Sequence, residues 1–301
     1  MPAPDTPLTS QVGHYENFPV ASWLCPAAIR PAVMAIYHFA RTADDLADEG
    51  TASAPERLES LSSYRVALDR CVKAPGETAD PSAWPEVFGP LARQIALHSL
   101  PMPLLHDLLS AFEQDVRHTA SGHVYANTAE LLDYCRLSAN PVGRLLLHLY
   151  GIGDALSLER SDAVCSALQL INFWQDISVD HARGRHYLPA DALARQGLTL
   201  EDFSGDAPAD VQVRCRRVIA ALCDEAREMM LQGAPLARRI PGRAGWELRL
   251  VVEGGLRILD KIAAIDHSSW LQRPTVGKAD IPVMLWRAVT GTHLNRRPLA
   301  G

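Results

Sequence analysis

The chain has few of the features that define membrane, secreted or disulfide-stabilised proteins. No run of about 18 consecutive apolar residues occurs, so the sequence predicts no ordinary membrane-spanning helix. Its six cysteines form no C-x-x-C pair, and a chain of 301 residues needs no disulfide staples. Residues 1–11 contain no lysine or arginine and lead into no apolar stretch, unlike a secretory signal. We therefore expect a cytoplasmic protein, with any membrane contact peripheral to the inner face of the membrane.

Positive charge and strand patterns are scarce as well. Lysine and arginine number 29 against 35 acidic residues, which leaves a net charge of −6. No global basic field is available to hold nucleic acid, so we expect no nucleic-acid partner. Apolar–polar alternation hardly appears, whereas apolar residues recur at three- and four-residue spacing. With 48% hydrophobic residues, the chain should fold as an all-α protein rather than remain disordered.

We expect one domain over residues 15–292, between a flexible N-terminal segment (1–14) and a C-terminal tail (293–301). Segments rich in helix-breaking residues interrupt the helical pattern, but each is short and has apolar helical sequence on both sides, which favours a single bundle. The expected helices are residues 31–47, 55–73, 84–97, 103–119, 128–138, 141–150, 160–177, 210–231, 246–264 and 281–292.

The first candidate functional segment is acidic and lies at the end of the first expected helix. Asp44 and Asp48 are four residues apart, so both should project from one helix face, with Arg41 on the same side. Two aligned carboxylates repel each other, and a hard divalent cation such as Mg²⁺, which takes oxygen ligands, would offset that repulsion. A solvated helix end explains the same spacing equally well.

A second acidic segment repeats this spacing on an apolar helix. Asp176 and Asp180 are again four residues apart, and Asn172 continues the polar stripe one turn earlier. Neighbours such as Phe173 and Trp174 should be buried, and carboxylates beside them are costly unless they are paired or bound to metal. Donors suited to phosphate and substrate recognition follow directly: Arg183, Arg185 and Tyr187.

Together, the two segments predict a metal-chelated diphosphate site that faces an apolar cavity. Neither segment is specific alone, but the pair on helices of an all-helical chain favours this site over a solvated acidic face. The expected Mg²⁺ ligands are Asp44, Asp48, Asp176 and Asp180, and the expected substrate contacts include Arg41, Asp45, Arg183 and Arg185.

At these residues the sequence resembles the squalene/phytoene synthase family. The segment Arg41 to Asp48 (RTADDLAD) is similar to the first Asp-rich motif of that family, and Gln169 to Pro189 is similar to its second. Four segments of the chain also resemble a bacterial subgroup of that family, the hydroxysqualene synthases: residues 16–22, 132–144, 172–176 and 273–280.

The resemblance implies an isoprenoid synthase bundle around a central apolar cavity. It implies Mg²⁺-dependent conversion of presqualene diphosphate, a prenyl diphosphate, to hydroxysqualene, with water rather than a hydride ending the reaction. No NADPH is expected in that case. A sister synthase and a reductase of squalene biosynthesis are the implied protein partners.

The roles of several further residues remain open at this point. Tyr134 is a candidate catalytic residue, and Tyr134, Asn172 or Gln175 could position the water. Asp115 faces either a cavity or solvent. Candidate substrate-contacting wall residues, for which ordinary core packing is an equal or better explanation, are Phe18, Tyr37, Phe39, Leu137, Leu145, Leu170 and Phe173.

Two other functions fit the same motifs. One is a different head-to-head step, in which two prenyl diphosphates are joined to presqualene diphosphate, squalene or phytoene. The other belongs to a different class: a catalytically silent helical partner that binds a prenyl diphosphate or docks on a sister synthase. Mg²⁺-dependent turnover would eliminate the second alternative.

Overall fold

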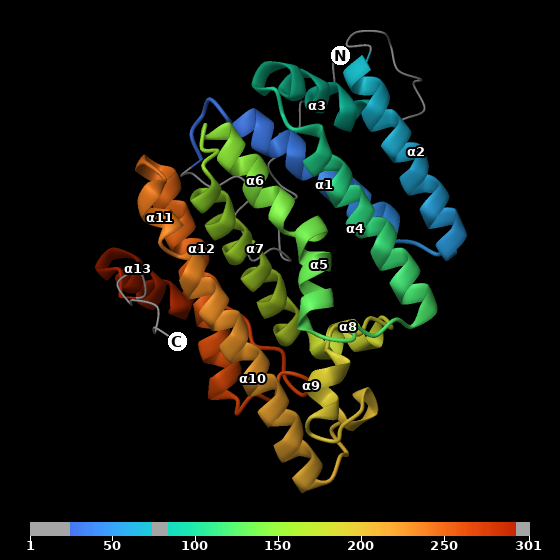
Figure 1. Ribbon diagram of the computed structural model, residues 1–301, viewed down its shortest axis with the longest axis vertical. Helices are drawn as coiled ribbons and strands as arrows, with labels where there is room; N and C mark the ends of the chain where they lie inside the picture. The colour runs from blue at the N-terminus through green and yellow to red at the C-terminus, as the bar shows by residue number, and fades with distance from the viewer. Residues whose placement is uncertain (1–24, 74–83, 293–301) are drawn as a thin grey trace, which may run out of the picture.

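The computed structural model describes residues 25–73 and 84–292 and confirms the all-α prediction (Figure 1). These parts of the chain contain no strand, and Val124 and His186 form an isolated parallel bridge. None of their helices combines the length and apolar character that crossing a bilayer requires. The helices are α1 (Arg30–Asp48), α2 (Ala54–Lys73), α3 (Pro85–His98), α4 (Met102–Ser121), α5 (Thr128–Ser138), α6 (Asn140–Leu149), α7 (Ala155–Gln175), α8 (Ile177–Ala182), α9 (Ala190–Ala194), η2 (Leu200–Asp202), α10 (Ala209–Gly233), α11 (Leu236–Arg239), α12 (Gly242–Ala264), η3 (Lys278–Asp280) and α13 (Ile281–Thr290).

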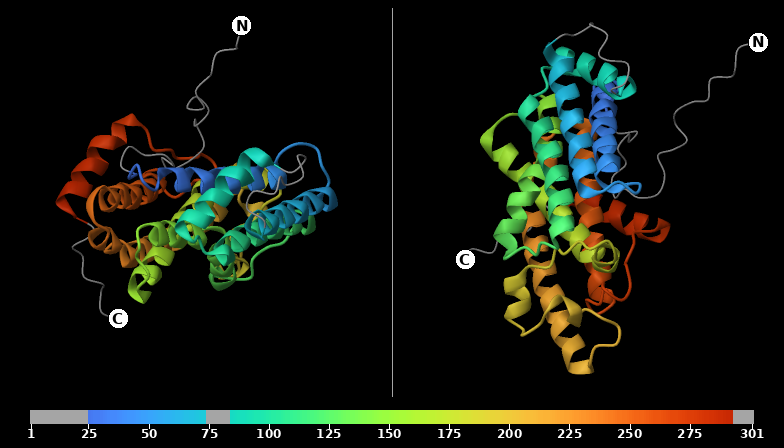
Figure 2. Two further views of the ribbon diagram at one scale, coloured as in Figure 1. Left: turned by 90° about the horizontal axis from the view of Figure 1, so that it is seen from above. Right: turned by 90° about the vertical axis from the view of Figure 1, so that its right-hand side faces the viewer.

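The helices form two groups, each with its own apolar core. Helices α1 to α4 gather around the stacked rings of Phe39 and Tyr64, which lie 5.4 Å apart and are both fully buried. The second core belongs to α5, α7, α10 and α12. Figures 1 and 2 place α1–α4 on one side of the molecule and α10–α13 on the other, with α5–α7 between them. Leu145 on α6 joins the first core, so α6 connects the two groups.

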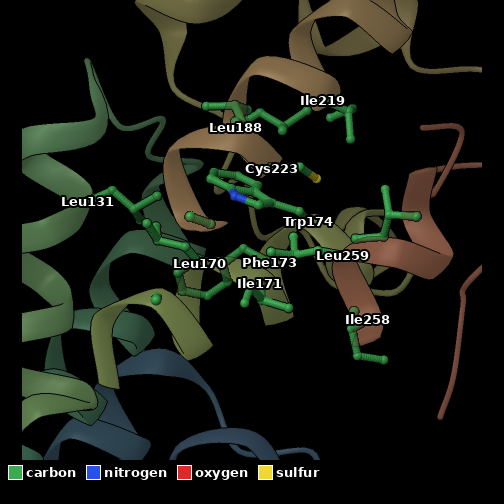
Figure 3. Packing of buried hydrophobic residues seen from close by; sticks show 14 of the residues in the cluster. Leu131, Leu170, Ile171, Phe173, Trp174, Leu188, Ile219, Cys223, Ile258 and Leu259 are labelled. Atoms are coloured by element: carbon green, nitrogen blue, oxygen red, sulfur yellow. The ribbon is translucent and has the colours of Figure 1, made fainter. Parts of the chain in front are cut away.

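Helix α7 is the centre of the second group. It packs against α5, α6, α10, α11 and α12, and its apolar residues are distributed around its whole circumference, as expected for a helix covered on all sides. Figure 3 shows Trp174, which is fully buried, among Leu188, Ile219 and Cys223. The second acidic segment therefore begins at the end of the most deeply buried helix of this core.

Local capping chemistry explains where α7 differs from the sequence prediction of 160–177. The helix begins at Ala155, because the Asp154 side chain accepts a hydrogen bond of 3.1 Å from the Ser157 amide and caps the first turn. It ends at Gln175, and a short separate helix, α8, follows. The short helices α9 and α11 were not expected, since five or fewer residues show no helical period.

Gly233, the last residue of α10, marks a close approach between α10 and α7. A Cβ atom at this position would lie 2.6 Å from the Arg160 carbonyl oxygen and 2.8 Å from the Val164 amide nitrogen. Both are backbone atoms of α7 and have little freedom to move. The close packing of α10 against α7 therefore depends on the missing side chain.

We predict that Gly233→Ala lowers the free energy of unfolding by about 1–3 kcal/mol, because the methyl group overpacks this helix crossing. The matched control is Gly254→Ala on α12, where a Cβ atom would meet only the flexible end of Met284 at 3.6 Å, an ordinary contact. The control should be more stable than the parent by about 0.5–1 kcal/mol, since alanine favours the helix. Urea denaturation measures both, and equal shifts in the two variants would contradict the packing argument.

Candidate active site

Helix α1 carries the first acidic cluster on its last two turns. The Arg41 guanidinium lies 3.0 Å from Asp44 and 2.7 Å from Asp45, and it also reaches Glu49 at 3.2 Å. Burial and the neighbouring Asp48 raise the pKa of Asp44 to about 6 despite this arginine. One guanidinium shared among three carboxylates leaves negative charge that it cannot neutralise.

The second acidic segment lies where α7 ends rather than along one continuous helix. Asp176 follows the last residue of α7, and its amide still donates to the Asn172 carbonyl at 2.9 Å. The Asp180 amide donates in turn to the Asp176 carbonyl at 2.9 Å. The one-turn spacing of the two carboxylates thus survives the helix break. Burial and Asp176 raise the pKa of Asp180 to about 7.

Arg185 joins the two acidic segments. Its guanidinium is ion-paired with Asp48 on α1, and Arg183 approaches the same carboxylate at 3.9 Å. Burial opposes the charge on Arg185, yet Tyr187, Asp48 and Asp115 together raise its pKa. The contact joins residues that are 137 positions apart in the sequence. The structure therefore brings the two acidic segments side by side, and their joint action as a diphosphate site stays a prediction.

Two strand-like contacts hold the segment that carries Arg185 in place. Beyond the Val124–His186 bridge, the Ala190 amide donates to the Tyr125 carbonyl at 2.8 Å. The loop between α4 and α5 is thereby tied to the loop between α8 and α9. Arg185 lies directly before this fixed segment, and its own amide donates to the Asp180 carbonyl at 2.9 Å, which preorganises the guanidinium.

A buried tyrosine–aspartate pair lies beside this junction. Tyr134 on α5 is 4% exposed, and its hydroxyl donates to the Asp115 carboxylate on α4 at 2.6 Å. Burial, with smaller contributions from Asp48 and Asp44, raises the pKa of Asp115 to about 7, although the hydrogen bond from Tyr134 and the charge of Arg185 oppose this rise. Asp115 therefore faces the site rather than solvent. The sequence had left this choice open. Helical periodicity could not identify it, since its partners lie on three other elements.

Aromatic rings cover one side of the site. Phe173 and Tyr187 stack at 3.8 Å with an interplanar angle of 14°. Tyr125 and Tyr134 lie 6.0 and 6.3 Å from Tyr187. A hollow of about 160 Å³ adjoins these rings and has Asp180 among its lining residues. The further lining residues are Ile177, Ser178, His181, Arg185, His186, Leu188, Leu200, Phe203 and Trp270.

Arg273 is a site residue that the sequence prediction missed. Its guanidinium holds both oxygens of Asp176, at 2.5 and 3.1 Å. Next to it, the Gln175 amide nitrogen donates to the Pro274 carbonyl at 2.7 Å, and Gln175 is 1% exposed. These contacts tie the loop before α13 to the second acidic segment. Arg273 lies 97 positions from Asp176, and Pro274 lies 99 positions from Gln175, so no local pattern in the sequence indicates these contacts.

The remaining predicted residues are distributed between the site and the core. Tyr37 is half-buried one turn before Arg41 on α1. Leu137 packs against the core around α7. Phe18 lies outside the described residues. For the other proposed wall residues, the structure favours ordinary core packing, because they are fully or almost fully buried within the two apolar clusters: Phe39, Leu145 and Leu170.

The donor set suits Mg²⁺ held jointly with a bound anion. Asp44, Asp48, Asp176 and Asp180 offer only hard oxygen ligands, in a region where burial and then a neighbouring carboxylate raise the pKa values of Asp44 and Asp180. Within residues 25–73 and 84–292, no three carboxylate, imidazole or thiolate groups gather closely enough to hold a metal ion. Mg²⁺ commonly uses one or two carboxylates and completes its coordination with substrate phosphates and water, so these residues would hold it only together with a bound diphosphate.

The fold and these charges define an all-helical protein with an acidic, arginine-bridged site. A sequence model of the squalene/phytoene synthase family matches residues 12–280. The hydroxysqualene synthase of Sinorhizobium fredii (strain NBRC 101917 / NGR234) is 32% identical over 86% of this chain and 82% of its own length. That of Rhodopseudomonas palustris (strain ATCC BAA-98 / CGA009) is 33% identical over 84% and 82%.

A solved structure extends the similarity to the fold. Squalene synthase HpnC from Alicyclobacillus acidocaldarius is 37% identical and matches with a TM-score of 0.73, covering 84% of this chain and 90% of that chain. The chain belongs to the squalene/phytoene synthase family of isoprenoid enzymes, which confirms the resemblance.

The raised pKa of Asp115 predicts a pH-dependent cost to stability. Between about pH 4 and 7 the folded protein retains a proton that the unfolded chain releases, so this group stabilises the fold at low pH and the contribution disappears as the pH rises through 7. Asp115→Asn keeps an acceptor for Tyr134 but cannot ionise. Relative to wild type, its free energy of unfolding should therefore increase from pH 5 to pH 8, by at most about 3 kcal/mol.

Urea denaturation at several pH values measures this difference. The control is Asp224→Asn, which replaces an exposed carboxylate on α10 and should track the wild type throughout. A pH-independent difference for Asp115→Asn would show that Asp115 has no raised pKa.

Proposed function

We propose that the protein converts presqualene diphosphate to hydroxysqualene and diphosphate with Mg²⁺. The observation that supports the proposal is the pairing of Asp48 with Arg185, beside which Arg183 approaches the same carboxylate. The similarity to two hydroxysqualene synthases supports the particular substrate and product. Membership of the family supports the broader class, an isoprenoid synthase that uses a prenyl diphosphate.

The charged residues have complementary tasks in this proposal. Mg²⁺, when bound by Asp44, Asp48, Asp176 and Asp180, would supply positive charge to the diphosphate. Arg41, Arg183 and Arg185 would bind its oxygens, since guanidinium groups donate paired hydrogen bonds to phosphate. As the carbon–oxygen bond breaks, its electron pair leaves with the diphosphate, and these cations stabilise that charge. Asp45 and Glu49 would hold Arg41 in position on α1.

The aromatic residues suit the carbocation that remains. Phe173 and Tyr187 line the hollow beside the site, and aromatic rings attract cations without offering a strong nucleophile. The hydroxyl of Tyr134 is held by Asp115 and could orient a water molecule at this wall. The oxygen of that water forms the new carbon–oxygen bond, and its surplus proton passes to solvent or diphosphate. We assign Asn172 to substrate contact and Gln175 to support of the site through Pro274.

A second candidate is the head-to-head condensation that forms presqualene diphosphate or squalene. The observation that favours it is the name of the solved relative, a squalene synthase that is 37% identical to this chain. Both reactions require the same diphosphate site, so geometry does not separate them. Substrate consumption does, because condensation requires farnesyl diphosphate whereas our proposal starts from presqualene diphosphate.

Asp44→Asn and Asp176→Asn should each reduce turnover by at least about a hundredfold, comparable to the loss of one strong electrostatic contact in the transition state. Asparagine preserves the shape of the side chain but removes its charge, so circular dichroism should report an unchanged fold. Asp224→Asn on α10 serves as the control and should retain wild-type turnover. Near-wild-type activity in either site variant would refute the assignment of that acidic segment.

Presqualene diphosphate and Mg²⁺ should yield hydroxysqualene without NADPH, and EDTA should abolish the reaction until Mg²⁺ is added back. In water enriched in oxygen-18, mass spectrometry should find the label in the new hydroxyl. Squalene formed only with NADPH would replace our proposal with a reductive ending. Rapid consumption of farnesyl diphosphate alone would favour condensation, and no turnover of either substrate would favour the catalytically silent partner.

A further inference from the structure

The exposed side of helix α13 is apolar, whereas the exposed side of a surface helix is usually polar. Its exposed residues are apolar, with Trp286 69% and Val289 64% exposed. Ile281, Leu285 and Val289 are spaced four apart, so they lie on one side of the helix, and Trp286 is adjacent to them. Figures 1 and 2 show α13 at the outside of the molecule, next to α12. We call Ile281, Leu285, Trp286 and Val289 the α13 apolar face.

The charged residue of α13 points the opposite way. Arg287 pairs with Asp260 on α12 at 2.7 Å, and Asp260 is also held by Arg227 on α10 at 3.0 Å. The inner side of α13 is therefore fixed to the body of the protein by an ion-pair network. This anchoring holds the apolar face outward, although its exposure to water is unfavourable.

The dimensions of the face argue against a second copy of this chain as its occupant. A ten-residue helix is about 15 Å long and about 10 Å wide, a footprint on the order of 150 Å². A stable protein–protein interface buries about 800 Å² on each partner. One helix face provides a small fraction of that area.

The charges around α13 favour an anionic surface. Lys278 is exposed directly before the helix, and the Asp280 carboxylate between them is shared by two cations, Arg257 and Lys261, both at 2.8 Å. This local excess of positive charge contrasts with the net charge of −6 for the whole chain.

We infer that the α13 apolar face docks on an anionic lipid bilayer. Leucine, valine and isoleucine side chains enter the boundary between headgroups and acyl chains, and tryptophan prefers that boundary. Lys278, Arg257 and Lys261, which lie near the start of the helix, contribute attraction to acidic headgroups. Because α13 follows the loop that Arg273 and Gln175 fix to the second acidic segment, the docked surface lies in defined register with the site. The inference depends on α13 alone and not on the reaction proposed above.

Co-sedimentation of the full-length protein with vesicles tests this inference. Wild type should bind vesicles of phosphatidylglycerol and phosphatidylcholine, and bind phosphatidylcholine vesicles more weakly. Leu285→Ser/Trp286→Ser should lower the partition coefficient at least tenfold while leaving the melting temperature unchanged, because both side chains face outward. The matched control is Leu97→Ser on α3, where the leucine is 72% exposed, and it should bind like wild type.

Several outcomes would overturn the inference. These are failure of the wild type to bind the mixed vesicles, and equal binding by the double variant. A lower melting temperature in the double variant would show that the chain itself covers the face. A wild-type dimer in sedimentation equilibrium without lipid, lost in the double variant, would assign the face to a second copy.

Discussion

The excess of negative charge at the junction of α1, α4 and α7 is the constraint on which the site depends. Carboxylates from these helices and from α8 converge there, and the pKa values of Asp44, Asp115 and Asp180 all rise toward neutral pH. Arg185 is the cation that they share, since it pairs with Asp48 and lowers the pKa values of the other three. The chain alone does not balance this charge. A bound cation would complete the balance, and a polyanion would then be attracted in turn.

Packing in the two apolar cores offsets the free-energy cost of holding these carboxylates close together. Strongly perturbed carboxylates persist only where the surrounding structure determines their positions, because they would otherwise move apart into water. Trp174 fixes the end of α7 in the second core, and the Phe39–Tyr64 stack fixes α1 in the first. The carboxylates are therefore held in position by helices whose apolar residues pack in the two cores. In our account, this rigidity preorganises the charges for a diphosphate.

Sequence patterns predicted the helices and the two acidic segments because both are local. Apolar residues three and four apart identify a helix, and two aspartates four apart identify a face, without knowledge of the rest of the fold. The patterns could not locate the end of α7 at Gln175, which depends on the conformation of Asp176. They also missed Arg273, whose partner Asp176 lies 97 residues away, and left the orientation of Asp115 open. Contacts of that kind are decided by how helices pack, and no short spacing in the sequence records them.

The central claim is that the two acidic segments bind one metal–diphosphate group together. Isothermal titration calorimetry with inorganic diphosphate, in the presence and absence of Mg²⁺, measures this coupling, since each ligand must strengthen the other by the same factor. Our account predicts that Mg²⁺ tightens diphosphate binding at least tenfold in the wild type, and that this enhancement disappears in both Asp44→Asn and Asp176→Asn. Diphosphate binding that is independent of Mg²⁺, or an enhancement that survives either substitution, would contradict it.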